Sequence, residues 1–377
     1  MQKTTRRLST FLAALGLLLC SFSMQAKAAD STVTVAKNAP QVAGAEADKH
    51  AAEGEKEFNA VEMIMHHISD SNEWHLWTST DENGEEHHVS IPLPVILYDG
   101  GFHFFMSSAI AHGHEHDGYT MEHGRVVSVQ GKQRATIADL FTGLDNKFID
   151  LSITKNVAGI LISILVLMLI FTASRKAYQK NSGIPKGVAG FTEPVILFIR
   201  DEVAIPNIGH KQAGRFLPLL LTIFFFIWIN NLLGLIPFFP GGTNVTGNIA
   251  VTMVLALITM VVVNVNGNKS YWGHIFKPPG VPAWLLPIMI PVEFLGILTK
   301  PFALMMRLFA NITAGHIMIL SLVSLIFMFK SVAIAPASVA LALFVSVLEL
   351  LVAALQAYIF TVLTALFIGM AVHEEHH

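Results

Sequence analysis

The sequence contains few charged residues and a single cysteine. Only 14% of its 377 residues are Asp, Glu, Lys or Arg, whereas 53% are hydrophobic, which is typical of membrane proteins. The one cysteine, Cys20, excludes a disulfide framework. No run of basic residues suggests nucleic acid as a partner, and no Gly-x-x-x-x-Gly-Lys-Ser/Thr loop is present to bind phosphate. The sequence therefore predicts a membrane protein without a nucleotide site of that kind.

The first 28 residues resemble an export signal. Lys3, Arg6 and Arg7 precede an apolar run, and Ala26-Lys27-Ala28 is a small-x-small cleavage site. The alternative is an N-terminal membrane anchor, but the apolar run is shorter than the roughly 20 residues of a span. We expect residues 1–28 to be a signal peptide, whose removal would leave the mature chain without cysteine.

Residues 29–150 are polar, rich in histidine and broken by Gly and Pro. Candidate strands lie at Val89–Leu97 and near Gly124–Gln130. Several histidines could bind a metal, but His-x-His-x-His spacing without further fixed ligands is a weak zinc signal. The simpler interpretation is a solvated polar loop outside the membrane. The histidines concerned are His87, His88, His112, His114 and His116.

Five apolar segments follow within residues 151–377. We predict membrane helices at 157–173, 216–239, 248–266, 286–329 and 332–372. The first segment is followed by basic residues, which places its end in the cytoplasm and the N-terminal region outside. Five crossings then leave the C-terminus in the cytoplasm. These basic residues are Arg175, Lys176, Lys180 and Lys186.

The last two segments are each about twice as long as a helix needs to cross roughly 30 Å of hydrocarbon at 1.5 Å per residue. Each could be a pair of short spans, but no polar turn divides either one. We therefore expect two long helices that form an inclined hairpin. The predicted fold class is an all-α polytopic membrane protein with about five membrane-embedded helices, preceded by a small exported region with some β structure.

Arg307 lies far inside the fourth segment, where a charge costs about 2.5–3.5 kcal/mol on insertion scales and normally faces a partner or a water path. Glu293 and Lys300 share its face because the three residues are seven apart, and Asn311 continues that face. His316 follows Arg307 by nine residues and therefore lies about half a turn away.

Glu349 and Gln356 are also seven apart and share a face of the last segment. Antiparallel packing of the two long helices would bring His316 toward Glu349 and Gln356 toward Arg307. Arg307, His316 and Glu349 are three ionisable groups at depth, which suggests a proton relay, and histidine titrates near neutral pH.

Simpler roles are open for several of these residues. Asn230 and Asn231, in the second segment, could only hydrogen-bond between helices. Glu293 and Lys300 could form a local ion pair near the membrane interface. Gln356 could likewise only join helices.

Three motifs resemble those of subunit a of the rotary F-type ATP synthases. They are Thr299–His316 (TKPFALMMRLFANITAGH), Leu355–Leu363 (LQAYIFTVL) and Asn231–Pro237 (NLLGLIP). The resemblance covers residues from about 155 to 372, in the order typical of the family. It does not cover most of the expected exported region.

The resemblance implies a non-catalytic proton-channel subunit in the membrane sector of an ATP synthase, in a bacterial inner membrane. Two half-channels would load and unload the carboxylates of a rotating ring of c subunits, and other subunits would make the ATP. The implied partners are the c-ring, subunit b of the peripheral stalk, the remaining Fo and F1 subunits and membrane lipid. The resemblance implies no cofactor and no metal.

In this family an arginine faces the ring, and the resemblance assigns that role to Arg307. Its positive charge would keep each arriving carboxylate ionised and would stop protons from leaking directly between the half-channels. Asn311 and Gln356 would flank it.

The resemblance also assigns His316 and Glu349 to the half-channel that opens to the outside. Many bacterial relatives have a carboxylate at the first of these positions and a histidine at the second, so the pair is exchanged here. Glu293 would lie on a polar path toward the other side, and Lys300 and Asn231 would be supporting polar residues.

Two other interpretations remain open. An independent ion-coupled transporter would also carry ionisable residues at depth, usually in broken helices within an internal repeat, and no repeat is evident. Alternatively, the helices could only anchor the histidine-rich outer region.

Overall fold

The computed structural model describes residues 64, 68–80, 86–122, 124–136, 139, 146–180, 184–236, 239–276, 282–329 and 334–372. The expected signal peptide lies outside these ranges. The described chain divides into two units. The first comprises residues 156–313 and 347–372, and the second comprises the residues up to Lys155 together with 314–346.

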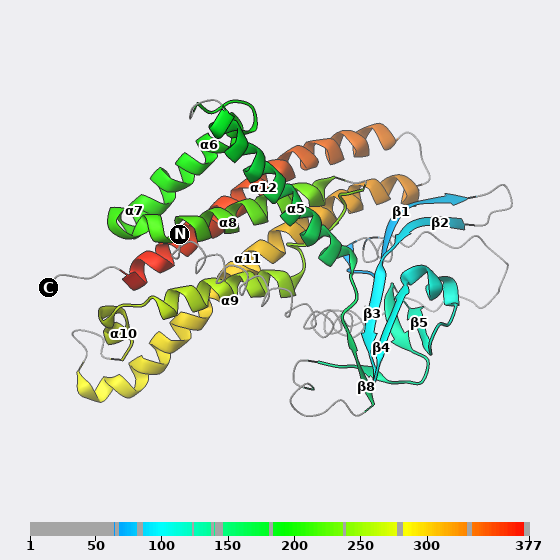
Figure 1. Ribbon diagram of the computed structural model, residues 1–377, viewed down its shortest axis with the longest axis horizontal. Coiled ribbons are helices and arrows are strands. Elements are labelled where there is room, and N and C mark those ends of the chain that lie inside the picture. The colour runs from blue at the N-terminus through cyan, green and yellow to red at the C-terminus, as the bar shows by residue number, and fades with distance from the viewer. Residues whose placement is uncertain are drawn as a thin grey trace. The chain divides into compact units, whose positions relative to one another are not determined.

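The N-terminal part of the second unit, residues 68–155, is built on short strands, and we call it the β region (Figure 1). Its described strands form two antiparallel pairs, β1–β2 and β5–β6, and a four-stranded sheet in the order β4-β3-β8-β7. The strands are β1 (Glu73–Thr80), β2 (Glu86–Pro92), β3 (Pro94–Tyr98), β4 (Phe102–Met106), β5 (Tyr119–Glu122), β6 (Arg125–Ser128), β7 (Gln133–Arg134) and β8 (Lys147–Asp150). Two 3₁₀ turns, Ser107–Ala109 and Ala111–Gly113, follow β4.

The β structure is more extensive than the two expected strands. The segment expected as one strand at Val89–Leu97 is two strands, β2 and β3, which belong to different sheets. The chain changes sheets at Leu93, whose N–H and C=O pair with Ser107. Pro94 follows directly and has no N–H to continue a ladder.

The β region has a hydrophobic core of its own, formed by Val95, Leu97, Phe105, Ile110, Tyr119, Val126 and Phe148. Alternate residues of β3 enter this core, as expected for a strand with one face inward. Beside it, Asp99 accepts hydrogen bonds from Lys132 and from the Tyr119 hydroxyl, and the hydrogen bond from Lys132 lowers the pKa of Asp99. Burial raises the pKa of Tyr119, so its hydroxyl remains a donor at neutral pH. The region is thus folded rather than a solvated loop.

The remaining chain is helical. The helices are α5 (Lys155–Lys180), α6 (Val188–Phe198), α7 (Ile205–Ile208), α8 (His210–Leu235), α9 (Ile249–Val265), α10 (Lys269–Phe276), α11 (Leu286–Phe329) and α12 (Ala335–Val372). A π-helical segment, Ile199–Ala204, joins α6 to α7, and a 3₁₀ turn, Ala283–Leu285, precedes α11.

Four of these helices, α5, α8, α11 and α12, are long and apolar enough to cross a membrane. Helix α9 with α10, bent by 101° at their junction, makes a fifth if the pair is one span. Helices suit hydrocarbon because they satisfy their own backbone hydrogen bonds. The predicted fold class is therefore confirmed: the protein is an all-α polytopic membrane protein with a small N-terminal β region.

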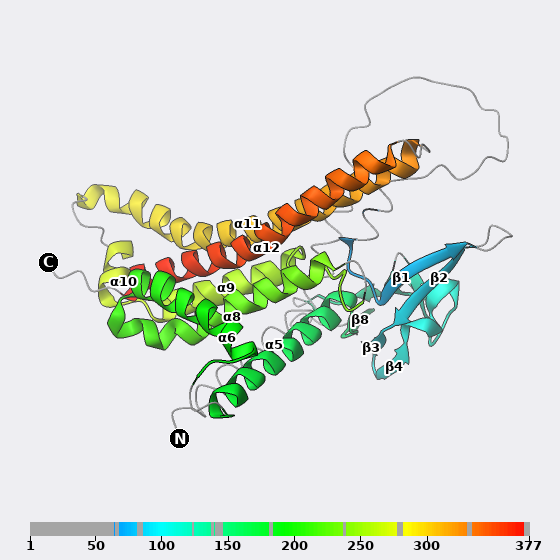
Figure 2. The same ribbon diagram turned by 90° about the horizontal axis from the view of Figure 1, so that it is seen from above.

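Helices α11 and α12 contain 44 and 38 residues, so each long apolar segment is one continuous helix and not a pair of short spans. Figure 2 shows their parts in the first unit next to each other, diverging toward the start of α11, and Lys300 of α11 contacts the ring of Phe367 on α12. At 1.5 Å per residue the two helices are about 66 and 57 Å long, nearly twice the thickness of the hydrocarbon.

The end of α12 is held by two neighbours. Asn268, just before α10, donates its backbone N–H to the Ala371 carbonyl at 2.8 Å and its side-chain Nδ2 to the Val372 carbonyl at 2.6 Å. These carbonyls have no partner within the helix itself. Gly369 packs so closely against α7 that a Cβ there would overlap the backbone carbonyl of Asn207.

We expect Gly369→Ala to destabilise the membrane helices by about 1–3 kcal/mol, because α7 or α12 must shift to admit the methyl group. The thermal unfolding midpoint of the purified complex measures this. Gly214→Ala on α8 is the matched control, since nothing lies within 4 Å of the added Cβ. Equal midpoints for the two variants would contradict the close contact at Gly369.

Candidate functional site

Helix α11 has a packed stripe and an exposed face. Leu304, Leu308 and Ile312 are buried at intervals of four residues, as expected for one side of a helix. Arg307 and Asn311 lie away from that stripe, and both are exposed. Within the described part of the chain, the guanidinium of Arg307 makes no hydrogen bond or ion pair.

Small residues surround Arg307 on this exposed face. Ala303 precedes it by one helical turn and Ala310 follows it by nearly one, and both are exposed. Small side chains let another helix approach closely within a membrane. The face thus offers an accessible cation with a small side chain about one turn to either side.

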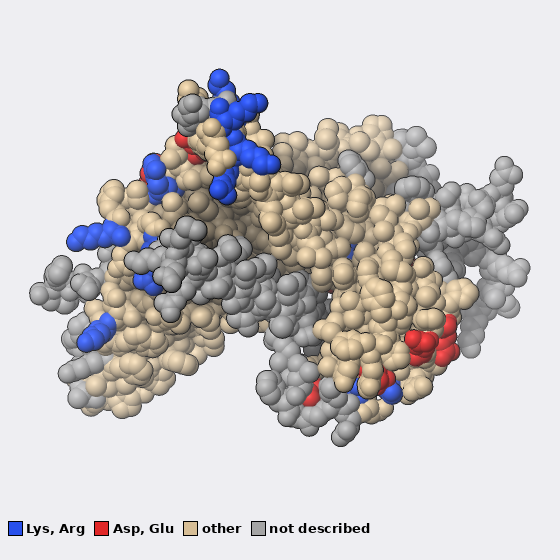
Figure 3. Space-filling model, in the orientation of Figure 1, with Lys and Arg blue, Asp and Glu red and all other residues tan. Residues whose placement is uncertain are grey.

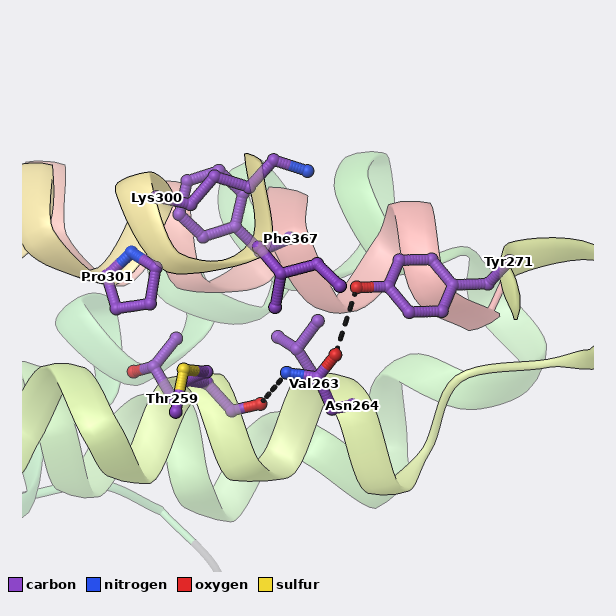
Figure 4. A pocket seen from close by; sticks show the side chains of 9 residues that line it. Thr259, Val263, Asn264, Tyr271, Lys300, Pro301 and Phe367 are labelled. Atoms are coloured by element: carbon purple, nitrogen blue, oxygen red, sulfur yellow. Dashed lines mark hydrogen bonds between the residues drawn. The ribbon is translucent and has the colours of Figure 1, made fainter. Parts of the chain in front are cut away.

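Lys300 and Glu293 do not form the local ion pair that remained open from the sequence. The Nζ of Lys300 instead lies 5.7 Å from the ring centroid of Phe367 on α12. Figure 4 shows Lys300 and Phe367 beside a small pocket, across from Asn264 and Tyr271. The Tyr271 hydroxyl donates to Asn264 Oδ1 at 3.2 Å and joins α10 to α9 there.

On α12 the polar residues lie on the packed face. Glu349 and Gln356 are only 5% and 4% exposed, and Ala353, between them on that face, is fully buried. A carboxyl group and an amide are therefore held inside the helix bundle. Burial of a charge at this position is costly unless the charge is compensated.

Asn231 joins three parts of the first unit. Its Nδ2 donates to the Ala353 carbonyl on α12 at 3.1 Å, and its Oδ1 accepts from Thr246 Oγ1 at 2.5 Å. Asn230 donates to Ser163 Oγ on α5 at 3.1 Å. Both asparagines therefore hydrogen-bond between helices, and a supporting role of Asn231 in a proton path stays a prediction.

Two further polar contacts were not anticipated from the sequence. Thr259 on α9 and Thr364 on α12 share a hydrogen bond of 3.4 Å, and Thr313 on α11 donates to the Gly247 carbonyl at 3.4 Å. Isolated threonines in apolar helices commonly hydrogen-bond to the backbone of their own helix. The sequence therefore does not show which threonines bond to another helix or loop. The contacts of Thr364 and Asn231 thus place hydrogen-bonding groups along the buried face of α12, and Thr313 joins α11 to the loop before α9.

The two expected pairings have different outcomes. Arg307 and Gln356 belong to the first unit but share no hydrogen bond, since one is exposed and the other buried. His316, which is half-buried, belongs to the second unit and Glu349 to the first. The pairing of His316 with Glu349 therefore stays a prediction.

The histidine-rich segment gives no metal centre within the described residues, where no group of three or more His, Cys, Asp or Glu could hold an ion. His114 and His116 are exposed before β5, and His103 pairs with Asp117 at 3.1 Å. The side chains of His87, His88 and His112 lie outside the described part.

These helices define a multi-pass membrane protein that carries an accessible arginine on one long helix and a buried carboxyl group on the next. Residues 157–369 match the family described as ATP synthase A chain, and the chain belongs to that family. Residues 63–151 match a domain of unknown function, which coincides with the β region.

Three relatives named ATP synthase subunit a illustrate the extent of the similarity. The chain is 50% identical to the one from Chloroherpeton thalassium, over 60% of this chain and 69% of the relative. It is 46% identical to that of Myxococcus xanthus, over 62% and 78%. It is 38% identical to that of Chlorobium phaeobacteroides (strain DSM 266), over 92% and 85%, so that match extends well beyond the membrane helices.

We expect Asn231→Leu to destabilise the helix bundle by about 1–3 kcal/mol, because Thr246 would be left with a buried, unsatisfied hydroxyl. The thermal unfolding midpoint of the complex would fall. Thr222→Val is the control, since that exposed hydroxyl bonds only the Pro218 carbonyl of its own helix. A midpoint unchanged by Asn231→Leu would show that the contact between α8 and α12 is dispensable.

Proposed function

We propose that this chain is the stationary proton-channel subunit in the membrane sector of an ATP synthase. In this proposal it provides two half-channels that load and unload the carboxylates of a rotating c-ring, and thereby couples proton flow to ATP synthesis. The chain itself performs no catalysis. Its other partners are subunit b of the peripheral stalk, the remaining Fo and F1 subunits and membrane lipid.

The observation that carries the proposal is the exposed Arg307. A guanidinium within a membrane helix is expensive unless an anion or water compensates it, and Arg307 finds no anion within the described chain. Small side chains, Ala303 and Ala310, lie about one turn to either side of it on the exposed face of α11. A carboxylate on a neighbouring helix of another subunit is the partner that this geometry suits.

Arg307 then separates the two half-channels. A carboxylate beside the guanidinium is stabilised in its ionised form, so it gives up its proton before it passes. Asn311, one turn further along the exposed face, and Gln356 on α12 complete the polar surroundings of this position. Protons can cross only by travelling with the ring.

The buried face of α12 belongs to the half-channel from the outside. Glu349 and Gln356 are buried there, and the contacts of Asn231 with Thr246 and Ala353 add polar groups beside them. His316 is the second titratable group of this path. Glu293, together with Lys300 seven residues further along α11, belongs to the half-channel toward the cytoplasmic side.

The distribution of basic residues supports an orientation. Most Lys and Arg side chains visible on the first unit lie at one end of it, over α6, α7, α10 and the end of α5 (Figure 3). By the positive-inside rule this end is cytoplasmic. We propose a bacterial inner-membrane protein with a signal peptide at 1–28, an exported region at 29–150, a membrane domain at 151–377 and a cytoplasmic C-terminus.

We expect Arg307→Ala to abolish ATP-driven acidification of inverted membrane vesicles, because the barrier between the half-channels is lost. The c-ring and the soluble head should remain attached, since the side chain is exposed and makes no hydrogen bond or ion pair within the described chain. Met306→Ala, which shortens an exposed apolar side chain in the same turn, is the matched control and should pump normally.

Normal acidification by Arg307→Ala would refute the mechanism and favour an independent transporter or an anchor. Loss of acidification together with detachment of the head would instead show that Arg307 serves assembly. Retained pumping after deletion of residues 68–150, with helices intact, would exclude an anchor that serves only the β region.

We expect the single variants His316→Glu and Glu349→His each to pump poorly, because each leaves two acids or two histidines in one path. The double variant should recover much of the acidification rate, since it restores one acid and one base. Vesicle acidification at equal amounts of assembled complex measures this. A double variant no better than the worse single one would contradict a shared role for the two positions.

A further inference from the structure

One face of the four-stranded sheet in the β region is apolar and is not covered by any other described part of the chain. The core face carries Val95, Leu97 and Phe105, whereas the residues between them point to the opposite side. We call this opposite side the outer sheet face. Its members are Pro94, Ile96, Tyr98, Phe102, Phe104, Met106, Ile149 and Leu151.

Several large apolar side chains on the outer sheet face are unusually accessible to solvent for a folded region. Phe102 is 77% exposed, Phe104 70% and Met106 41%, and Leu151 just beyond β8 is 52% exposed. They belong to one surface because Tyr98, Ile96 and Pro94 of β3 lie directly opposite the three β4 residues in the antiparallel register. A contiguous apolar patch of this kind marks an interaction surface.

Two charged groups of the sheet lie away from the outer sheet face. Asp150 shares the core side of β8 with Phe148, where it pairs with Arg134 at 2.6 Å. Asp99 is engaged by Lys132 beyond the end of β3.

Lys147 of β8 does lie on the outer side, two residues before Ile149, and its Nζ pairs with Asp139 Oδ1 at 2.7 Å. The eight apolar members, centred on β3 and β4, carry no acid or base, so this part of the sheet suits an uncharged apolar environment.

The covalent structure ties one end of this face to the start of a membrane helix. Beyond β8 the chain continues along β3: Leu151 N–H donates to the Ile96 carbonyl at 2.9 Å and Ile153 N–H to the Pro94 carbonyl at 3.0 Å. Lys155, only two residues later, is the first residue of the membrane helix α5. Two residues span at most about 7 Å, so the Pro94 end of the sheet cannot leave the start of that helix.

We propose that the outer sheet face lies on the lipid bilayer, with Phe102, Phe104 and Met106 inserted at the boundary between headgroups and acyl chains. Aromatic side chains favour this boundary. Burial of exposed apolar area contributes about 25 cal/mol per Å². The β region, which carries the match to a domain of unknown function, is then a membrane-lying element rather than a free outer domain. This does not depend on the proposed proton mechanism.

The test is depth measurement by spin labelling in the complete complex, reconstituted into phosphatidylcholine vesicles with Cys20 replaced by Ser. For each nitroxide, the accessibility to oxygen is divided by the accessibility to a water-soluble nickel chelate. This ratio should be several-fold higher for Phe104→Cys than for Val129→Cys. Val129 is the matched control because it is apolar, 53% exposed and outside the outer sheet face. Phe102→Cys should behave like Phe104→Cys.

Equal access of the nickel chelate to positions 104 and 129 would overturn the proposal, because the face would then lie in water. Shielding of position 104 from both reagents, with an immobilised spectrum, would also overturn it and would show that protein covers the face. ATP-driven acidification checks that each labelled complex is assembled, since exposed positions should tolerate the label.

Discussion

Hydrocarbon supplies no hydrogen-bond partners, and this constraint governs every polar group that the chain carries into its membrane helices. Asn231 meets it by donating to a carbonyl of α12 and accepting from Thr246. Asn230 meets it through Ser163 on α5, and Thr259 through Thr364. The same contacts that satisfy these groups also fix how α5, α8, α9 and α12 pack.

Arg307 has no hydrogen-bond or ion-pair partner within the described chain, so we expect its partner in another subunit. A residue kept for stability alone would pair inside the bundle, as the two asparagines do. Glu349 represents the opposite case, a carboxyl group enclosed by its own helices. One long helix therefore offers a charge outward, and its neighbour holds a titratable group inward.

The long helices could be predicted because length and hydropathy alone decide them. Helical spacing also predicts that Asn311 shares the face of Arg307, and both residues are exposed on α11. The partner of Asn231 could not be predicted, because a backbone carbonyl 122 residues away leaves no mark in the sequence. The β region was underestimated because its strands are only two to eight residues long and change sheet at Leu93. The roles of Arg307, His316 and Glu349 rest on the resemblance and remain predictions.

The fastening of the end of α12 has a mechanical consequence. Asn268 binds its last carbonyls, and Gly369 leaves no gap against α7. A helix gripped in this way cannot slide along its axis or unwind at its tip without breaking both contacts. A sideways load on α12 is therefore passed to α7 and to the corner between α9 and α10. In the proposed rotary mechanism, this bracing would give α12 the stiffness that a stationary subunit needs beside a rotating ring.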